Sequence, residues 1–221
     1  MKLPFTTEQF FDLFRQYNEA VWPAQIALNL LALAALGFLA FRRETSGRAV
    51  SGILSLLWAW TGIAYHLVYF TRINKAAFVF GVLFLAGSAA FLWAGVIKRR
   101  LQFSVADAPR RIVGTLLLAY GLLVYPALSI LFGHGYPFMP TFGLPCPTTI
   151  FTIGMLFFLT TPYPRYVVVA PVLWSAMGSS AAFHFGVYQD LGLLVAGIAG
   201  IVLIVLPQTI RASTASEWSQ E

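Results

Sequence analysis

Charge is what this sequence has least of. Only 10% of its 221 residues are charged, whereas 59% are apolar and the mean hydropathy is +0.78. Soluble domains have roughly 25% charged and about 45–50% apolar residues. The composition therefore excludes a soluble protein and indicates an all-α integral membrane protein that is surrounded by a lipid bilayer. A chain of this length has room for about seven spans of roughly 20 residues, and none for a separate soluble domain.

Cysteine, lysine and histidine are also scarce. The first two shortages exclude an intrachain disulfide and a retinal site, and the third counts against a ceramidase-like hydrolase without excluding it. A single Cys rules out an intrachain disulfide. The chain has no Lys after Lys98, so the last helix lacks the Schiff-base Lys of retinal proteins, and retinal is excluded as a cofactor. The closest pair of His, His134 and His184, is 50 positions apart. The sequence therefore lacks the pair of His, one helical turn apart, that zinc-dependent ceramidase-like hydrolases use.

Long apolar runs are abundant, and they predict seven transmembrane helices within a domain covering residues 24–207. The fifth and seventh runs are short for a bilayer of roughly 30 Å. Pro162 and Pro164 divide the fifth run from the sixth, because Pro interrupts a helix. Residues 208–221 form a polar tail. The seven runs cover residues 24–41, 49–70, 76–97, 112–132, 148–161, 166–186 and 191–206.

The segment before the first run, "TTEQFFDLFRQYNEAVW", predicts an amphipathic helix within residues 1–23. Thr6 and Gln9 are spaced as a capping box, and Trp22 with Pro23 marks a bend. The helix is expected either to lie on the membrane surface or to extend the first span. Its apolar positions at helical spacing are Phe10, Leu13, Phe14, Tyr17 and Val21.

Basic residues predict the orientation. If the spans alternate, Lys2, Arg15, Arg72 and Lys75 fall on one side and ten basic residues on the other. The richer side is expected to be cytoplasmic, so the N-terminus is outside and the C-terminus inside. Since the charges cluster at helix ends and not over one face, nucleic acid is not an expected partner. The ten residues are Arg42, Arg43, Arg48, Lys98, Arg99, Arg100, Arg110, Arg111, Arg165 and Arg211.

This threading places every His, the only Cys and one Asp in a single outer layer. Ionisable residues near a membrane are costly unless paired or hydrated, so they mark a candidate ligand site. Imidazole and thiolate ligands suit Zn or Cu, and the candidate metal ligands are His66, His134, Cys146 and His184. The remaining candidate ligand-binding residues are Thr148, Ser180 and Asp190. Ser180 lies one turn before His184, on the same helix face.

Each of these residues also has a plainer interpretation. His66 lies between Tyr65 and Tyr69 and fits the aromatic belt at the membrane interface. His134 lies between two Gly, as in a solvated loop. Asp190 suits the N-cap of the last helix. Cys146 and His184 are compatible with roles in packing alone.

The stretch "GHGYPFMPTFGLPCPTT", from Gly133 to Thr149, interrupts the apolar pattern with four Pro and three Gly. Its prolines prevent a regular helix, and Thr148 is a candidate cap for the short fifth helix. Non-helical backbone at membrane depth is tolerated where it is buried in protein or lines a wet cavity. The stretch is either a re-entrant loop over an outward-facing pocket or a rigid surface loop.

Small residues at helical spacing predict close helix packing. Gly192, Ala196 and Gly200 form one stripe, and Ala176 with Ser180 begins another. Such stripes let helices approach closely, either within one chain or in a homo-oligomer.

Three blocks carry a resemblance that extends over nearly the whole chain: "GHGYPFMPTFGLPCPTTIFTIGML", "INKAAFVFGVLFL" and "SSAAFHFGVYQDLGLLVAG". Together with the opening "PFTTEQFFDLFRQYNEAVWPAQ", they resemble an uncharacterised family of bacterial multi-pass membrane proteins classed as a domain of unknown function. The resemblance implies a multi-pass protein of the bacterial inner membrane and no established activity.

Three functional hypotheses follow. The first is a small-solute or ion transporter or channel with an outward-facing pocket formed by the Pro-rich stretch, His66, His184 and Asp190. Broken backbone beside ionisable residues is typical of transport sites. The second is a metal-dependent membrane enzyme, with Asp190 in an acid/base or supporting role. The third is a membrane sensor or assembly partner without catalysis.

Overall fold

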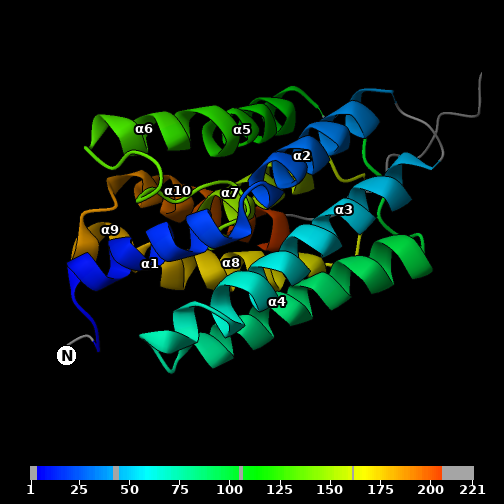
Figure 1. Cartoon of the computed structure of the whole chain (residues 1–221). Helices are drawn as coiled ribbons and strands as arrows, with labels where there is room; N and C mark the ends of the chain where they lie inside the picture. Colours follow the sequence, from blue (N-terminus) through cyan, green and yellow to red (C-terminus); the bar gives the residue numbers. More distant parts are fainter. Residues whose placement is uncertain (1–3, 42–44, 105–106, 161, 206–221) are drawn as a thin grey trace, which may run out of the picture.

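The computed structural model describes residues 4–41, 45–104, 107–160 and 162–205, and these residues form an all-helical bundle (Figure 1). Within these ranges, six helical segments are long and apolar enough to cross a membrane, which supports a multi-pass membrane protein. They are Ala24–Phe41, Ser46–Arg72, Ala77–Ile97, Ala108–Leu131, Tyr166–Phe185 and Tyr188–Val205.

Three of these segments change their helical pitch along the way. Wide π-helical turns continue α3 (Ser46–Trp60) as η1 (Thr61–Leu67) and α4 (Ala77–Phe91) as η3 (Leu92–Ile97). In the fourth segment, η4 (Tyr120–Val124) joins α5 (Ala108–Ala119) to α6 (Tyr125–Leu131). Such turns rotate the side chains that follow them and are frequent at functional sites. The remaining span elements are α2 (Ala24–Phe41), η2 (Phe70–Arg72), α8 (Tyr166–Gly178), α9 (Ser180–Phe185), η5 (Tyr188–Asp190) and α10 (Leu191–Val205).

The fifth predicted span differs from the prediction. It forms α7 (Pro145–Leu156), whose 12 residues cover about 18 Å, too short for a hydrocarbon core of roughly 30 Å. Every residue of α7 except Cys146 is buried, because α5, α8 and α10 pack around it. The short run therefore reflects a helix that is enclosed by protein and does not need to match the bilayer.

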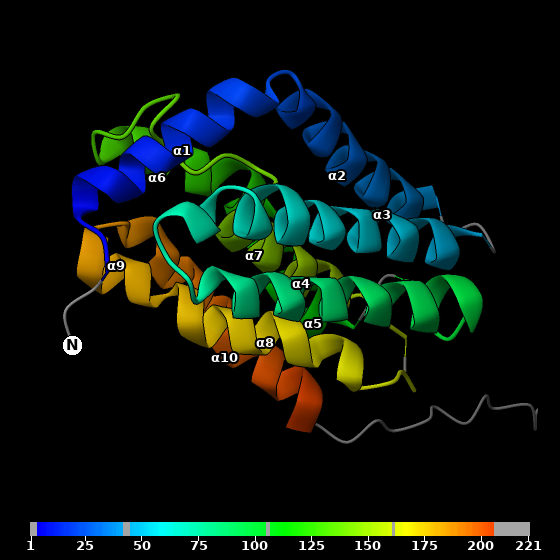
Figure 2. The ribbon, with the colours of Figure 1, turned by 60° about the horizontal axis from the view of Figure 1, so that its bottom comes forward.

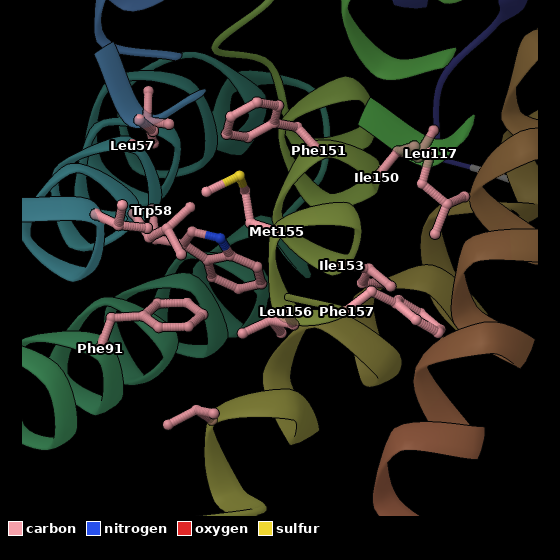
Figure 3. Close-up of a cluster of buried hydrophobic side chains, with 14 of the residues drawn as sticks. Leu57, Trp58, Phe91, Leu117, Ile150, Phe151, Ile153, Met155, Leu156 and Phe157 are labelled. Atoms are coloured by element: carbon pink, nitrogen blue, oxygen red, sulfur yellow. The ribbon is translucent and has the colours of Figure 1, made fainter. Parts of the chain in front are cut away.

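The core is built around α7 (Figure 3). The Trp58 ring stacks on Phe84 with centroids 4.4 Å apart, and Trp58 Nε1 donates to Thr152 Oγ1 at 2.9 Å. This bond gives the buried indole N–H a partner. An indole N–H left without one in an apolar core would cost about 1–3 kcal/mol. Large apolar side chains from four helices belong to the same core cluster: Leu57, Phe91, Leu117, Ile150, Phe151, Ile153, Met155, Leu156 and Phe157.

The predicted N-terminal helix is α1 (Thr7–Val21), and its capping box between Thr6 and Gln9 is confirmed. The chain bends at Trp22 and Pro23 before α2, as expected (Figure 2). The apolar face of α1, however, packs on protein. Phe10 stacks on Phe185 of α9, and Tyr17 contacts Tyr65 of η1. The apolar face of α1 is therefore covered by other parts of the same chain.

The two ends of the bundle differ in character. One end, here called the α1 end, carries α1, α9 and the loop after α6 (Figures 1 and 2). At the opposite end Arg110 Nη2 donates to the carbonyl of Leu159 at 2.9 Å, near the basic residues Lys98, Arg99, Arg100 and Arg111. Arg42, Arg43, Arg211 and the predicted tail at 208–221 lie outside the described residues.

The small-residue stripe of α10 packs inside the chain. A Cβ on Gly192 would collide with the Tyr120 ring, and a Cβ on Gly200 would collide with Val172. Ala196 is fully buried, whereas Ala176 and Ser180 are exposed. The α10 stripe thus serves packing between helices of one chain.

Candidate functional site

A cavity of about 200 Å³ lies at the α1 end, between α1, η1, the start of α7, α8, α9 and η5. We call it the aromatic cavity, because nine of its 19 lining residues are aromatic. The aromatic residues are Phe5, Phe10, Phe14, Tyr65, Phe70, Phe80, Tyr125, Trp174 and Phe185, and the others are Asn74, Pro140, Leu144, Pro145, Cys146, Met177, Gly178, Ser180, Ala181 and Asp190.

Three polar side chains from separate helices meet at this cavity. The hydroxyl of Tyr125 donates to Asp190 Oδ1 at 2.6 Å, and both residues are buried. The thiol of Cys146, in the first turn of α7, lies beside the Asp190 carboxyl. The Trp174 indole N–H lies near the same thiol, without a hydrogen bond of good geometry. Asp190 is thus the centre of a small polar cluster in an apolar wall.

Among the described residues, Asp190 has no cationic partner. It forms no ion pair, and its neighbours are the neutral groups of Tyr125 and Cys146. A buried carboxylate without a counter-ion is costly, and more so at membrane depth. Such a group either stays protonated or accepts a positive charge from outside the protein.

Hydrogen bonds around η5 hold Asp190 in position. Tyr120 donates its hydroxyl to the carbonyl of Gln189 at 2.8 Å, and Gln189 Nε2 donates to Ser129 Oγ at 3.0 Å. Ser129 in turn donates to the carbonyl of Tyr125 at 3.1 Å. The turn before α10 is therefore fastened to α6, and the Asp190 carboxyl meets Tyr125 at the cavity wall.

The Pro-rich stretch divides into an exposed tip and a buried arm. Most of residues 133–138 are exposed, whereas Met139, Pro140 and residues 142–145 are buried. Asn18 of α1 holds the arm, since its Nδ2 donates to the carbonyls of Pro137 at 2.7 Å and Met139 at 2.8 Å. The arm leads directly into α7 and brings Cys146 to the aromatic cavity.

Thr61 and Thr148 complete the fastening of this arm. Thr61 Oγ1 donates to the carbonyl of Gly143 at 3.0 Å, and the Gly143 N–H donates to Thr148 Oγ1 at 3.2 Å. Because α7 begins at Pro145, Thr148 lies inside the helix and does not cap it as predicted. It binds the backbone of the preceding turn instead.

The three His do not gather at the aromatic cavity. His66 is fully buried in a shell of aromatic rings, including Phe84 and Trp174, and neither ring nitrogen has a hydrogen-bond partner. His134 stacks on Phe11 with centroids 3.9 Å apart. His184 is exposed, with Nδ1 2.9 Å from the carbonyl of Ser180. The three His were predicted in one layer, but they lie at separate places in the structure.

The structure does not bring the predicted metal ligands into one group. Among the described residues, no group of three or more His, Cys, Asp or Glu side chains is placed to hold a metal ion. His66 lies among aromatic rings, His134 stacks on Phe11 and His184 is exposed, whereas Cys146 lines the aromatic cavity. The predicted pairing of Ser180 with His184 involves the Ser180 carbonyl, because the Ser180 hydroxyl donates to the carbonyl of Met177. Of the seven candidate site residues, Cys146, Ser180 and Asp190 line the aromatic cavity.

Sequence analysis missed Tyr125, Trp174 and Asn18. Tyr125 precedes Pro126 inside an apolar run, and a hydroxyl at that depth needs a partner, which was a usable signal. Asn18 follows Tyr17 on the side of α1 that proved to be buried, so it was a polar residue facing protein. No pattern in the sequence pairs Tyr125 or Asn18 with its hydrogen-bonding partner.

The chain belongs to DUF6064, a family of unknown function, whose profile matches residues 7–216. No curated protein matches the chain. No solved structure matches the chain either.

Proposed function

We propose that the protein is a small-solute transporter of the bacterial inner membrane, and that the aromatic cavity is its outward-facing binding site. The observation that carries the proposal is the path from the Pro-rich arm into α7. A short, fully enclosed helix that begins at a cavity from non-helical backbone is an arrangement that transporters use at their substrate sites. Cys146, Tyr125 and Asp190 supply polar groups at that point.

The same proposal includes the threading of the chain. The Pro-rich arm and α7 together form a further crossing, which gives seven crossings with the six long segments. The α1 end faces the outside, and the basic end with Lys98 and Arg110 faces the cytoplasm. The charge asymmetry of the sequence supports this orientation.

Labelling of single cysteines tests the orientation. In a Cys146→Ser background, Gly135→Cys places a thiol at the exposed loop tip, where a side chain meets no neighbour. Lys98→Cys is the matched variant at the basic end. A membrane-impermeant maleimide should label Gly135→Cys in intact cells and label Lys98→Cys only after lysis. The opposite pattern would invert the topology and place the cavity on the cytoplasmic side.

A flux measurement tests transport itself. Proteoliposomes are loaded with radiolabelled amines, carboxylates, polyols and inorganic ions, and efflux is compared with protein-free liposomes. We expect one class to leave faster through the protein and Ser180→Trp to abolish that efflux, because Ser180 lines the cavity. Ala176→Trp is the control, since Ala176 is exposed one turn earlier and does not line the cavity. Ligand binding without any flux would favour the sensor hypothesis.

The metal-enzyme hypothesis receives no comparable support. Among its proposed ligands, His66 is enclosed by aromatic rings, His134 stacks on Phe11, and His184 is exposed. The transporter proposal needs none of these residues as ligands.

A further inference from the structure

We propose that the aromatic cavity binds a small organic cation, such as a quaternary or protonated amine, with its positive charge between Asp190 and the surrounding aromatic rings. This inference rests on the proposed function in one respect, namely that the cavity is the solute site. It adds the chemical class of the solute.

The first argument is the charge of the lining. Asp190 is the one residue with a formally charged side chain among the described residues that line the cavity, and it has no ion pair within the protein. An anionic solute would be repelled by the ionised carboxylate, and a neutral solute would leave the group either protonated or without a counter-charge. A bound cation supplies the missing counter-charge to the buried Asp190 carboxylate. An unpaired charge is most costly at such a buried position.

The second argument is the aromatic wall. The face of an aromatic ring carries partial negative charge and attracts a cation within about 6 Å, most strongly where water is excluded. The cavity is lined by the rings of Phe10, Tyr65, Phe70, Phe80 and Trp174. Aliphatic side chains would have been enough to bind an apolar solute. An aromatic shell around one carboxylate is the arrangement that recognises ammonium groups.

The third argument is size and desolvation. A cavity of about 200 Å³ is smaller than the roughly 300–1,000 Å³ of sites for drug-sized ligands. Lys and Arg side chains are absent from the described lining, and most of the described lining residues are apolar or aromatic. A methylated ammonium needs no donors and is weakly hydrated, so it fits such a lining better than an inorganic cation that requires several oxygen ligands.

The matched ligands for the test are choline and its neutral carbon isostere, 3,3-dimethylbutan-1-ol. The two have the same shape and differ in the charge of the quaternary centre. Binding is measured by calorimetry on the purified full-length chain in lipid nanodiscs, and quenching of Trp fluorescence provides a second signal. We expect choline to bind at least about tenfold more tightly than the isostere, consistent with about 1.4 kcal/mol or more of charge recognition.

The variant Asp190→Asn keeps the size of the side chain and an oxygen acceptor for Tyr125, but it removes the negative charge. Choline affinity should fall at least about tenfold in this variant, while the affinity for the isostere stays unchanged. The control is Asp12→Asn on α1. Hydrogen bonds from Gln16 and Arg15 lower the pKa of Asp12, so it is a carboxylate at neutral pH, but it lies outside the cavity. This variant should bind choline as the wild type does.

The comparison of the two ligands on wild-type protein decides the matter even if Asp190→Asn does not fold. Equal affinity for choline and the isostere would overturn the cation assignment while leaving a solute site in place. If neither ligand binds and tetramethylammonium also fails, the cation assignment is again wrong, and the flux measurement decides separately whether the protein transports another solute. Cation binding without flux would support the assignment and overturn transport.

Discussion

Tyr125 and Asp190 are 65 positions apart in the sequence, and their side chains share the hydrogen bond of 2.6 Å at the wall of the aromatic cavity. Tyr125→Phe removes the donor and leaves a buried carboxyl with one partner fewer. We expect a loss of about 1–3 kcal/mol in unfolding free energy. Thermal or denaturant unfolding in detergent measures it.

Tyr120→Phe is the matched control. It also removes a hydroxyl near η5, but Tyr120 is only half-buried and donates to the carbonyl of Gln189. Its loss should be smaller than that of Tyr125→Phe, because the Tyr120 hydroxyl is not fully buried and the Asp190 carboxyl keeps its bond from Tyr125. Equal losses in the two variants would contradict a special role for the bond to Asp190.

The Pro-rich arm should depend on the amide of Asn18. Asn18→Asp keeps an acceptor for the Thr141 hydroxyl but places a carboxylate oxygen against the carbonyls of Pro137 and Met139. We expect faster hydrogen exchange at residues 138–144 and a loss of about 1–3 kcal/mol. Asn29→Asp, which removes a single donor to the carbonyl of Gln25, should leave exchange in the arm unchanged.

Gly143 is expected to tolerate no side chain. Its φ of +99° favours glycine, and a Cβ would collide with Leu28. Gly143→Ala should cost about 1–3 kcal/mol from backbone strain alone. Gly135→Ala should cost little, because Gly135 has open space around it and lies in the same loop. If the two alanine variants unfold at the same temperature, the description of the arm is wrong.

The α10 stripe provides a test of packing against oligomerisation. Gly192→Leu places a side chain against the Tyr120 ring and should destabilise the single chain. Gly37→Leu on α2 adds the same side chain where no neighbour lies within 4 Å, so stability should be retained. Size-exclusion chromatography with light scattering measures the accompanying mass. A stable Gly192→Leu protein that merely loses its partner copy would show that the stripe is an interface between chains.

Hydropathy predicted the helices well because bilayer depth is encoded along the chain. The break at Pro162 and Pro164, the capping box at Thr6 and the bend at Trp22 follow from local chemistry and were found in the structure. The rotation of each helix about its axis is different. In a membrane protein both the core face and the lipid face are apolar, so the sequence does not show which side is buried.

Because helix rotation is not visible in the sequence, the predicted site residues did not all gather at one site. His66, Cys146 and Asp190 were all placed in one layer by depth, yet Cys146 and Asp190 turn toward each other while His66 turns into a shell of aromatic rings. The π-helical turn η1 contributes, since it shifts the angular positions of the residues within it. The contact between Tyr125 and Asp190 depends on such rotations and on which helices are neighbours, and neither is visible in one sequence.

The enclosure of α7 restricts how the chain can be made. Its buried Thr148, Thr149 and Thr152 and its length of 12 residues make it a poor membrane span on its own. Two of its neighbours, α8 and α10, are synthesised after it. We therefore expect the segment from Gly133 to Thr160 to wait in a polar environment during synthesis, and to enter the bundle only when the last helices arrive. A chain truncated after Tyr163 should leave this segment open to protease, whereas the complete chain should protect it.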